Sequence, residues 1–255
     1  MFKDLKLRVF SGLALFTSFI VIVFIYPILL KPIVFMLAFI MLRELYLLNG
    51  KIKTGDFVFI IVGIANTFPL IFSQSNLMLA FSLAFSLALL TIFLSKSIFV
   101  GLGQLYIVSS HILLLDLIVS DPPVGGLLFF VFFVVCVALS DIGGYFGGQI
   151  IGGKKVFERI SPNKTWAGVF VGWLLVCIFY YFLFFIGVFG SYFYFFLFLG
   201  IALSSQIGDF IESYTKRYFG VKDSGQIIPG HGGALDRFDG MIFSIYFVKL
   251  FDLLF

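Results

Sequence analysis

One polar stretch near the C-terminal end gathers acidic, basic and glycine residues in a chain that is otherwise strongly apolar. Asp209, Glu212 and Lys216 are three, four and seven positions apart, a spacing that places them on one face if they form a helix. Asp236 and Asp239 are also three positions apart. Clustered carboxylates need a cation or basic groups to balance their charge, and oxygen ligands without cysteine or histidine favour Mg²⁺ over zinc. The stretch therefore indicates a metal–phosphate site, with ordinary ion pairs at the membrane surface as the alternative.

The same stretch also carries basic side chains and a glycine-rich loop, both of which suit phosphate groups. Lysine and arginine side chains donate strong hydrogen bonds to phosphate oxygens. Residues 229–233, Pro-Gly-His-Gly-Gly, disfavour a regular helix, and the glycines allow a close approach of the backbone to a ligand. His231 is either a proton-transfer or phosphate-binding group or part of a polar lining. The loop predicts a phosphate-binding segment, and a plain turn is the alternative.

Two polar features farther upstream are further candidates. Asp141 lies late in an apolar run, where an acid is expected to face protein or water; a packing role is the alternative. Lys164 lies in the segment 161–166, Ser-Pro-Asn-Lys-Thr-Trp, just before a predicted helix start, and anions are favoured at helix N-termini. The alternative is that Lys164 is an ordinary loop lysine on the cytoplasmic side of the membrane. Asp116 has no predicted partner.

Long apolar runs make up most of the chain. Hydrophobic residues account for 61% of it and charged residues for 12%, whereas soluble domains carry about 25% charged residues. Each run is near the length of about 20 residues that a helix needs to cross a bilayer, and a backbone in lipid must satisfy its own hydrogen bonds. The sequence therefore predicts an all-α polytopic integral membrane protein with about nine transmembrane helices. The predicted spans are residues 9–30, 32–50, 56–73, 76–95, 97–119, 124–147, 166–189, 191–211 and 238–255.

The lysine and arginine positions predict the orientation of these spans. With the N-terminus in the cytoplasm, all 17 of them except Lys31 and Lys249 fall on the cytoplasmic side, in agreement with the positive-inside rule. The C-terminal end then lies on the far side of the membrane. The two long polar loops, 148–165 and 212–237, face the cytoplasm, where nucleotides are available. The sequence has no basic tail of the kind that would indicate a nucleic-acid partner.

We predict a single membrane domain over residues 1–255, because no linker or low-complexity tract divides it. Residues 1–120 contain spans without a recognised motif, and residues 121–255 form the catalytic half with both polar loops. The absence of an internal repeat argues against a transporter. An ion or metabolite transporter that uses the intramembrane residues Asp141 and Asp116 is nevertheless an alternative function.

The C-terminal half resembles the phosphatidate cytidylyltransferase family, also called CDP-diacylglycerol synthases. The main motif is Ser213-x-x-Lys216-Arg217-x₄-Lys222-Asp223-x₅-Pro229-x-His231-Gly232-Gly233-x-x-Asp236-Arg237-x-Asp239. Two shorter motifs precede it in the expected order, Ser140-Asp141-x-Gly143-Gly144 and Ser161-Pro162-Asn163-Lys164-Thr165-Trp166. The first 130 residues are similar to the family only in being membrane spans.

This resemblance implies transfer of a cytidylyl group from CTP to phosphatidic acid, giving CDP-diacylglycerol and pyrophosphate. It also implies a divalent metal and a homodimer. With the oxygen ligands above we expect this metal to be Mg²⁺, with a second cation as an option, and with the charge distribution we expect a multi-pass protein of the cell's inner (cytoplasmic) membrane whose site faces the cytoplasm. The implied metal ligands are Asp209 and Asp236. We predict catalytic roles for Lys216, Asp223 and Asp239. The predicted substrate-binding residues are Asp141, Ser161, Asn163, Lys164, Arg217, Lys222, His231, Gly232, Gly233 and Arg237. An enzyme for another phosphorylated lipid is a further alternative.

Overall fold

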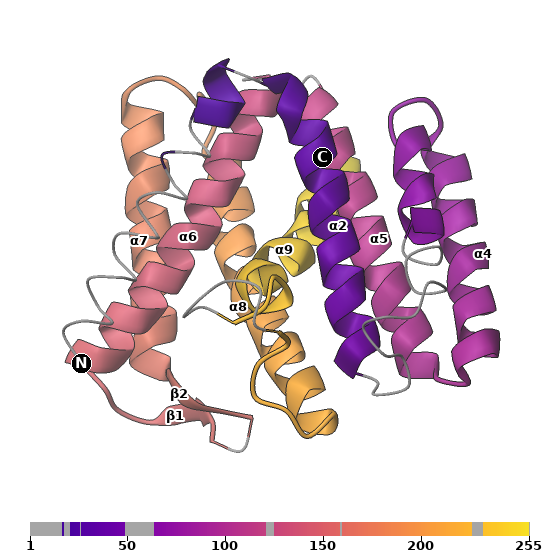
Figure 1. Cartoon of the computed structure of the whole chain (residues 1–255). Helices are drawn as coiled ribbons and strands as arrows, with labels where there is room; N and C mark the ends of the chain where they lie inside the picture. The colour runs from indigo at the N-terminus through magenta and orange to yellow at the C-terminus, as the bar shows by residue number, and fades with distance from the viewer. Residues whose placement is uncertain are drawn as a thin grey trace. The chain divides into compact units, whose positions relative to one another are not determined.

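Helices dominate the chain, and one short β-hairpin interrupts them (Figure 1). The structure is a computed structural model that describes residues 17, 21–25, 27–48, 64–120, 125–158, 160–225 and 232–254. The elements are η1 (Pro27–Leu29), α2 (Leu30–Leu48), η2 (Phe68–Phe72), α4 (Leu77–Ser95), α5 (Ile98–Val119), α6 (Gly126–Ile150), β1 (Lys155–Phe157), β2 (Ser161–Thr165), α7 (Trp166–Phe185), α8 (Phe193–Tyr218) and α9 (Leu235–Leu254). Within these described ranges, five helices, α4 to α8, are long and apolar enough to cross a membrane. The chain is therefore an all-α, multi-pass membrane protein.

The helices start within a few residues of the predicted spans wherever the chain is described. Residues 9–16, 18–20 and 26 of the predicted first span, 9–30, and residues 56–63 of the predicted third span, 56–73, lie outside the described residues. Helices α2 and α9 also match predicted spans, but they carry more charged side chains than α4 to α7, for example Arg43 and Glu44 in α2. The count of nine spans and their orientation stay predictions.

The two predicted polar loops contain regular structure that the sequence analysis did not assign. In 148–165, β1 pairs with β2 in antiparallel register, with Lys155 opposite Thr165. These strands are short and polar, so the segment has no apolar alternation to mark them. In 212–237, α8 continues to Tyr218, and Gly220 follows two residues later with a φ of 72°, the left-handed conformation that glycine favours after a helix end.

The chain divides into two compact units. The first contains residues 1–116 and 223–237, and the second contains residues 117–222 and 238–255. Helix α9 begins in the first unit and continues in the second. This division does not test the predicted single membrane domain, which stays a prediction.

In the first unit, α5 packs closely against α2 and holds a buried polar network. A Cβ atom at Gly103 of α5 would come within 2.9 Å of the Leu45 side chain of α2, so only glycine fits without a shift. Nearby, the Tyr46 hydroxyl donates to Gln104 Oε1 at 2.8 Å, Gln104 Nε2 donates to Asn66 Oδ1 at 2.6 Å, and Asn66 Nδ2 donates to the Tyr46 oxygen at 2.7 Å. This closed ring satisfies polar groups that would be costly to bury alone.

In the second unit, α6, α7 and α8 pack side by side through small and polar residues (Figure 1). A Cβ atom at Gly143 of α6 would lie 2.5 Å from the Cα of Gly172 in α7, so the two backbones nearly touch. Gln206 joins all three helices, because Trp173 of α7 donates to its Oε1 at 3.0 Å and its Nε2 donates to Ser140 of α6 at 3.2 Å. This packing fixes the helix that carries the acidic residues at its polar end.

Candidate active site

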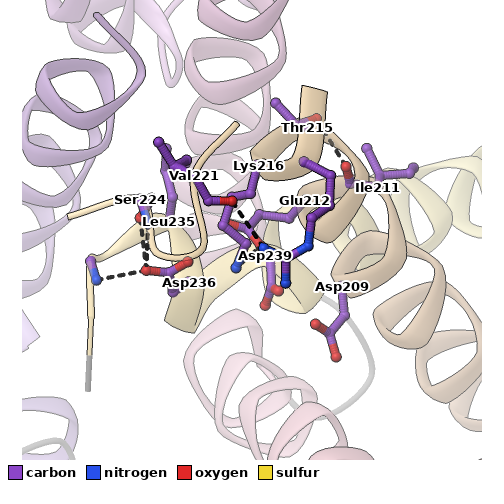
Figure 2. Close-up of polar contacts among 12 residues, drawn as sticks. Asp209, Ile211, Glu212, Thr215, Lys216, Val221, Ser224, Leu235, Asp236 and Asp239 are labelled. Atoms are coloured by element: carbon purple, nitrogen blue, oxygen red, sulfur yellow. Dashed lines mark hydrogen bonds and ion pairs between the residues drawn. The ribbon is translucent and has the colours of Figure 1, made fainter. Parts of the chain in front are cut away.

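The C-terminal turns of α8 carry two carboxylates, and each has a lysine partner in the second unit. Asp209 forms a salt bridge with Lys164 of β2. The Lys164 ammonium also lies 4.6 Å from the ring centre of Phe210. One turn later, Glu212 pairs with Lys216 at 2.5 Å along the same helix face (Figure 2). The predicted shared face of α8 therefore exists, because the helix runs unbroken from Phe193 to Tyr218.

The start of α7 explains how Lys164 reaches this face. The Thr165 side chain caps α7 by accepting a hydrogen bond from the Gly168 N–H at 3.1 Å. Strand β2 therefore leads directly into the helix, with Lys164 as the residue just before the cap. The sequence analysis expected Lys164 at a helix start but did not pair it with Asp209, which is 45 positions away in the sequence.

Asp239, one turn into α9, joins this acidic cluster. It is buried, with 9% of its surface exposed. Its carboxyl group interacts electrostatically with those of Asp209, Glu212 and Asp141. Close contact between α8 and α9 makes this possible, because a Cβ atom at Gly208 would lie only 2.6 Å from the Asp239 carbonyl oxygen.

The charges of this acidic cluster point to a cation. Carboxylates held this close repel one another, and a bound cation reduces that repulsion. In the described part of the chain, no group of three or more His, Cys, Asp or Glu side chains is arranged to hold a metal ion. Mg²⁺ needs fewer protein ligands, because it usually binds one or two carboxylates and completes its shell with water and substrate phosphate. The Asp209 and Asp239 carboxylates are possible ligands of that kind.

Asp236, in the first unit, organises the segment before α9. Its Oδ2 accepts hydrogen bonds from the Ser224 N–H at 2.9 Å, the Ser224 hydroxyl at 3.0 Å and the Gly233 N–H at 2.8 Å (Figure 2). A Cβ atom at Gly232, whose φ is 82°, would come within 2.7 Å of the same oxygen. The loop before α9 thus holds the Asp236 carboxylate through Oδ2.

A carboxylate that the sequence analysis missed supports the same segment. Glu44 of α2 is completely buried, at 0% exposure. It accepts hydrogen bonds from the Ser224 hydroxyl at 3.1 Å and from the Ala234 and Leu235 N–H groups at 2.8 Å each. The available signal was an acid inside the apolar run 32–50, where charges are expensive and usually functional.

The other predicted site residues that the structure describes lie mostly at the surface. Arg217 is exposed and donates to the Val221 carbonyl at 3.0 Å, so its side chain folds over the end of α8. Gly233 is buried beside Glu44. His231 lies outside the described residues. Exposed as well are Asp141, Asn163, Lys222, Asp223 and Arg237, whereas Ser161 is half-buried.

Comparison with known proteins adds independent information. A family model described as the cytidylyltransferase family matches residues 6–255. A phosphatidate cytidylyltransferase of Brucella suis is 40% identical over 148 residues, which is 55% of this chain and 52% of that protein. Proteins of the same name from Helicobacter pylori and Staphylococcus saprophyticus are 42% identical over 134 residues and 40% identical over 148 residues. These matches cover 49% and 57% of this chain and 50% and 52% of the two proteins.

The chain spans about half the length of the curated relatives that it matches. The family model, in contrast, extends over both compact units and includes the acidic cluster of α8 and α9. The resemblance inferred from the sequence is thereby confirmed at the level of the family. Because the model matches nearly every residue, the chain belongs to the cytidylyltransferase family.

Proposed function

We propose that this protein transfers a cytidylyl group from CTP to phosphatidic acid and so supplies CDP-diacylglycerol for phospholipid synthesis. Membership of the cytidylyltransferase family supports the reaction type, and the printed name of the relatives supports the lipid substrate. The observation that carries the proposal is the joined set of acidic and lysine side chains, Asp209 with Lys164 and Glu212 with Lys216, at the polar end of an otherwise apolar helix. Such a site suits the polar headgroup of a lipid.

The proposed reaction is a displacement at the α-phosphorus of CTP. A phosphate oxygen of phosphatidic acid forms the new bond to this phosphorus, the bond between the α-phosphorus and the bridging oxygen breaks, and pyrophosphate leaves with that electron pair. The attacking phosphate is already an anion, so the enzyme needs little base catalysis. Its main tasks are to align two polyanions and to balance the charge that develops on the leaving group.

Lys216 of α8 and Lys164 of β2 are the groups that we assign to this charge balance. Lys216 and Lys164 would donate to CTP phosphates, while Arg217, on the neighbouring face, would hold the phosphatidate headgroup through its planar guanidinium group. The exposed positions of Lys222, Asp223 and Arg237 keep them open to either substrate. His231, Gly232 and Gly233 remain proposed as phosphate contacts.

Mg²⁺ is the proposed cofactor, with Asp209 and Asp236 as principal ligands and Asp239 beside Asp209. When bound, Mg²⁺ neutralises phosphate charge and orients the phosphate groups. The acidic cluster supports the assignment of Asp209, because two lysines face the four carboxyl groups of Asp141, Asp209, Glu212 and Asp239. A second cation is compatible with the same excess of negative charge.

We also propose nine spans, a cytoplasmic N-terminus, a site that faces the cytoplasm of an inner-membrane enzyme, and a homodimer. The distribution of lysine and arginine supports the orientation. The homodimer rests on the family resemblance alone. Crosslinking of the protein in its native membrane, followed by detergent gel electrophoresis, tests it, and a crosslinked species of twice the monomer mass is expected.

The decisive experiment for the function is an assay of the purified protein in detergent with phosphatidic acid, labelled CTP and Mg²⁺. We expect labelled CDP-lipid and an equal amount of pyrophosphate. Replacing phosphatidic acid with other phosphorylated lipids tests the alternative substrate class, and a preferred second lipid would reassign the substrate. Failure to form any cytidylyl-lipid, together with solute uptake into vesicles, would favour the transporter alternative.

A further inference from the structure

In the described part of the chain, the buried Glu44 carboxylate accepts hydrogen bonds from Ser224 and from the residues at the start of α9. Burying a charged or polar group without partners is expensive, and here three donors meet its two oxygens: the Ser224 hydroxyl and the N–H groups of Ala234 and Leu235. Helix α2 is otherwise rich in apolar residues that fill the core. An apolar side chain at position 44 would need no hydrogen-bond partners, whereas the Glu44 carboxylate needs the donors of the α9 segment.

The donors that Glu44 satisfies belong to the start of a helix. The first N–H groups of a helix have no carbonyl partner within it, and their positive end favours a carboxylate. Most helices obtain this cap from a side chain next to their own first turn. Helix α9 instead obtains it from a residue 190 positions before Ala234 in the sequence.

Glu44 also reaches Asp236 through one intermediate side chain. The Ser224 hydroxyl lies 3.1 Å from Glu44 Oε2 and 3.0 Å from Asp236 Oδ2, so the two carboxylates share one hydroxyl group. The loop fits tightly around Glu44. A Cβ atom at Gly225 would lie 2.7 Å from Oε1, and one at Gly233 would lie 2.6 Å from both oxygens. Gly225 and Gly233 thus leave room for this carboxylate.

We propose that Glu44 is a positioning residue of the active site. It holds the first turn of α9 and the Ser224–Asp236 pair in one arrangement, and so fixes the direction in which the Asp236 carboxylate faces. The inference rests on the proposed function in one respect, the role of Asp236 as a ligand of the divalent cation. It extends the functional site into the half of the chain that carries no recognised motif.

The test compares Glu44→Gln with two control variants. Glutamine keeps the shape but leaves only one oxygen to accept hydrogen bonds, so an N–H group at the start of α9 loses its acceptor. Tyr46→Phe removes a buried hydroxyl from the same helix without touching the α9 segment. Glu158→Gln repeats the chemical change at an exposed site. Glu44→Asp keeps the charge on a shorter side chain.

Three measurements on the full-length protein in detergent separate the possibilities. Hydrogen–deuterium exchange of the peptide 232–240 reports on the start of α9. Electron paramagnetic resonance with Mn²⁺ alone, without substrate, reports divalent-cation binding. Steady-state kinetics give kcat and the Mg²⁺ concentration for half-maximal rate. For Glu44→Gln we expect faster exchange in 232–240 and a cation affinity weakened about 10- to 100-fold, as for other groups that orient a ligand. Glu44→Asp should fall between this variant and the wild type.

Tyr46→Phe should lower the unfolding temperature but leave exchange in 232–240 and Mn²⁺ binding at wild-type values, and Glu158→Gln should change nothing. Equal behaviour of Glu44→Gln and Tyr46→Phe, or a wild type that binds no Mn²⁺, overturns the proposal. If Glu44→Gln does not fold, the comparison of Glu44→Asp with Tyr46→Phe decides in the same way. A wild type that binds Mn²⁺ and shows these differences but forms no CDP-lipid refutes the proposed function and leaves the positioning role in place.

Discussion

The Asp209 carboxylate forms an ion pair with the Lys164 ammonium and also interacts electrostatically with the Asp239 carboxyl group. We expect Asp209→Asn to lower kcat about 100- to 1000-fold, comparable to the loss of one preorganised electrostatic group, and to raise the Mg²⁺ concentration needed for half-maximal rate. The protein should stay folded because asparagine has the same shape. Kinetics across a Mg²⁺ titration, with circular dichroism of each variant, measure both effects.

The matched control for this prediction is Asp252→Asn. Asp252 is exposed near the end of α9 and lies 3.7 Å from Lys249, and a surface pair of this kind contributes little. The control should keep the wild-type rate. A near-normal rate of Asp209→Asn over the whole Mg²⁺ range would remove Asp209 from the proposed ligands.

Lys216 and Arg217 are adjacent in the sequence but differ in their surroundings. Lys216 pairs with Glu212 within the acidic face, whereas Arg217 is exposed and bends toward Val221. Lys216→Ala should lower kcat, because charge on the phosphates grows in the transition state. Arg217→Ala should mainly raise the apparent KM for phosphatidate at a fixed detergent ratio. If both variants changed only the CTP parameters, the division between the two residues is wrong.

At the scale of elements, the contact of α8 with α9 decides whether the acidic cluster forms. Gly208→Ala would place a Cβ atom 2.6 Å from the Asp239 carbonyl oxygen, a backbone atom that can yield only if the helix shifts. We expect a loss of about 1–3 kcal/mol in stability, typical of overpacking, together with a lower kcat. Unfolding temperature in detergent and the CDP-lipid assay measure the two effects.

Gly190→Ala is the control for this helix contact, because a Cβ atom at Gly190 meets nothing within 4 Å. It should leave both the unfolding temperature and kcat unchanged. Unchanged stability and rate of Gly208→Ala would mean that the close approach of α8 and α9 is not needed for activity.

At the scale of the whole molecule, the orientation is the property with the widest consequences. Lys154 and Lys222 are exposed and belong to the polar segments that the charge distribution assigns to the cytoplasm. In a background without Cys136 and Cys177, a cysteine at either lysine position should resist a membrane-impermeant maleimide in intact cells and react after permeabilisation. Pro122, which lies outside the described residues, is the predicted external control and should react in intact cells. External labelling at position 222 contradicts the orientation.

The sequence by itself determined the features that depend on local pattern. Apolar runs of bilayer length predicted α4 to α8 as membrane-crossing helices, because the cost of an unsatisfied backbone in lipid allows few other structures. Helical spacing predicted that Glu212 and Lys216 share a face, and they form an ion pair. The order of the polar motifs was sufficient to indicate the family.

Only the tertiary structure decided which distant residues meet. Lys164 and Asp209 are 45 positions apart, and Glu44 and Leu235 are 191 positions apart. The first pair depends on the hairpin that leads into α7 and on the packing of α7 against α8. The second depends on the space that Gly225 and Gly233 leave around Glu44. Neither arrangement has a local sequence pattern. The sequence shows that the Glu44 carboxylate is costly to bury. The groups that offset this cost by hydrogen bonding include the backbone N–H groups of Ala234 and Leu235. Because every residue except proline carries such a group, no sequence pattern can identify the ones that a buried carboxylate will meet.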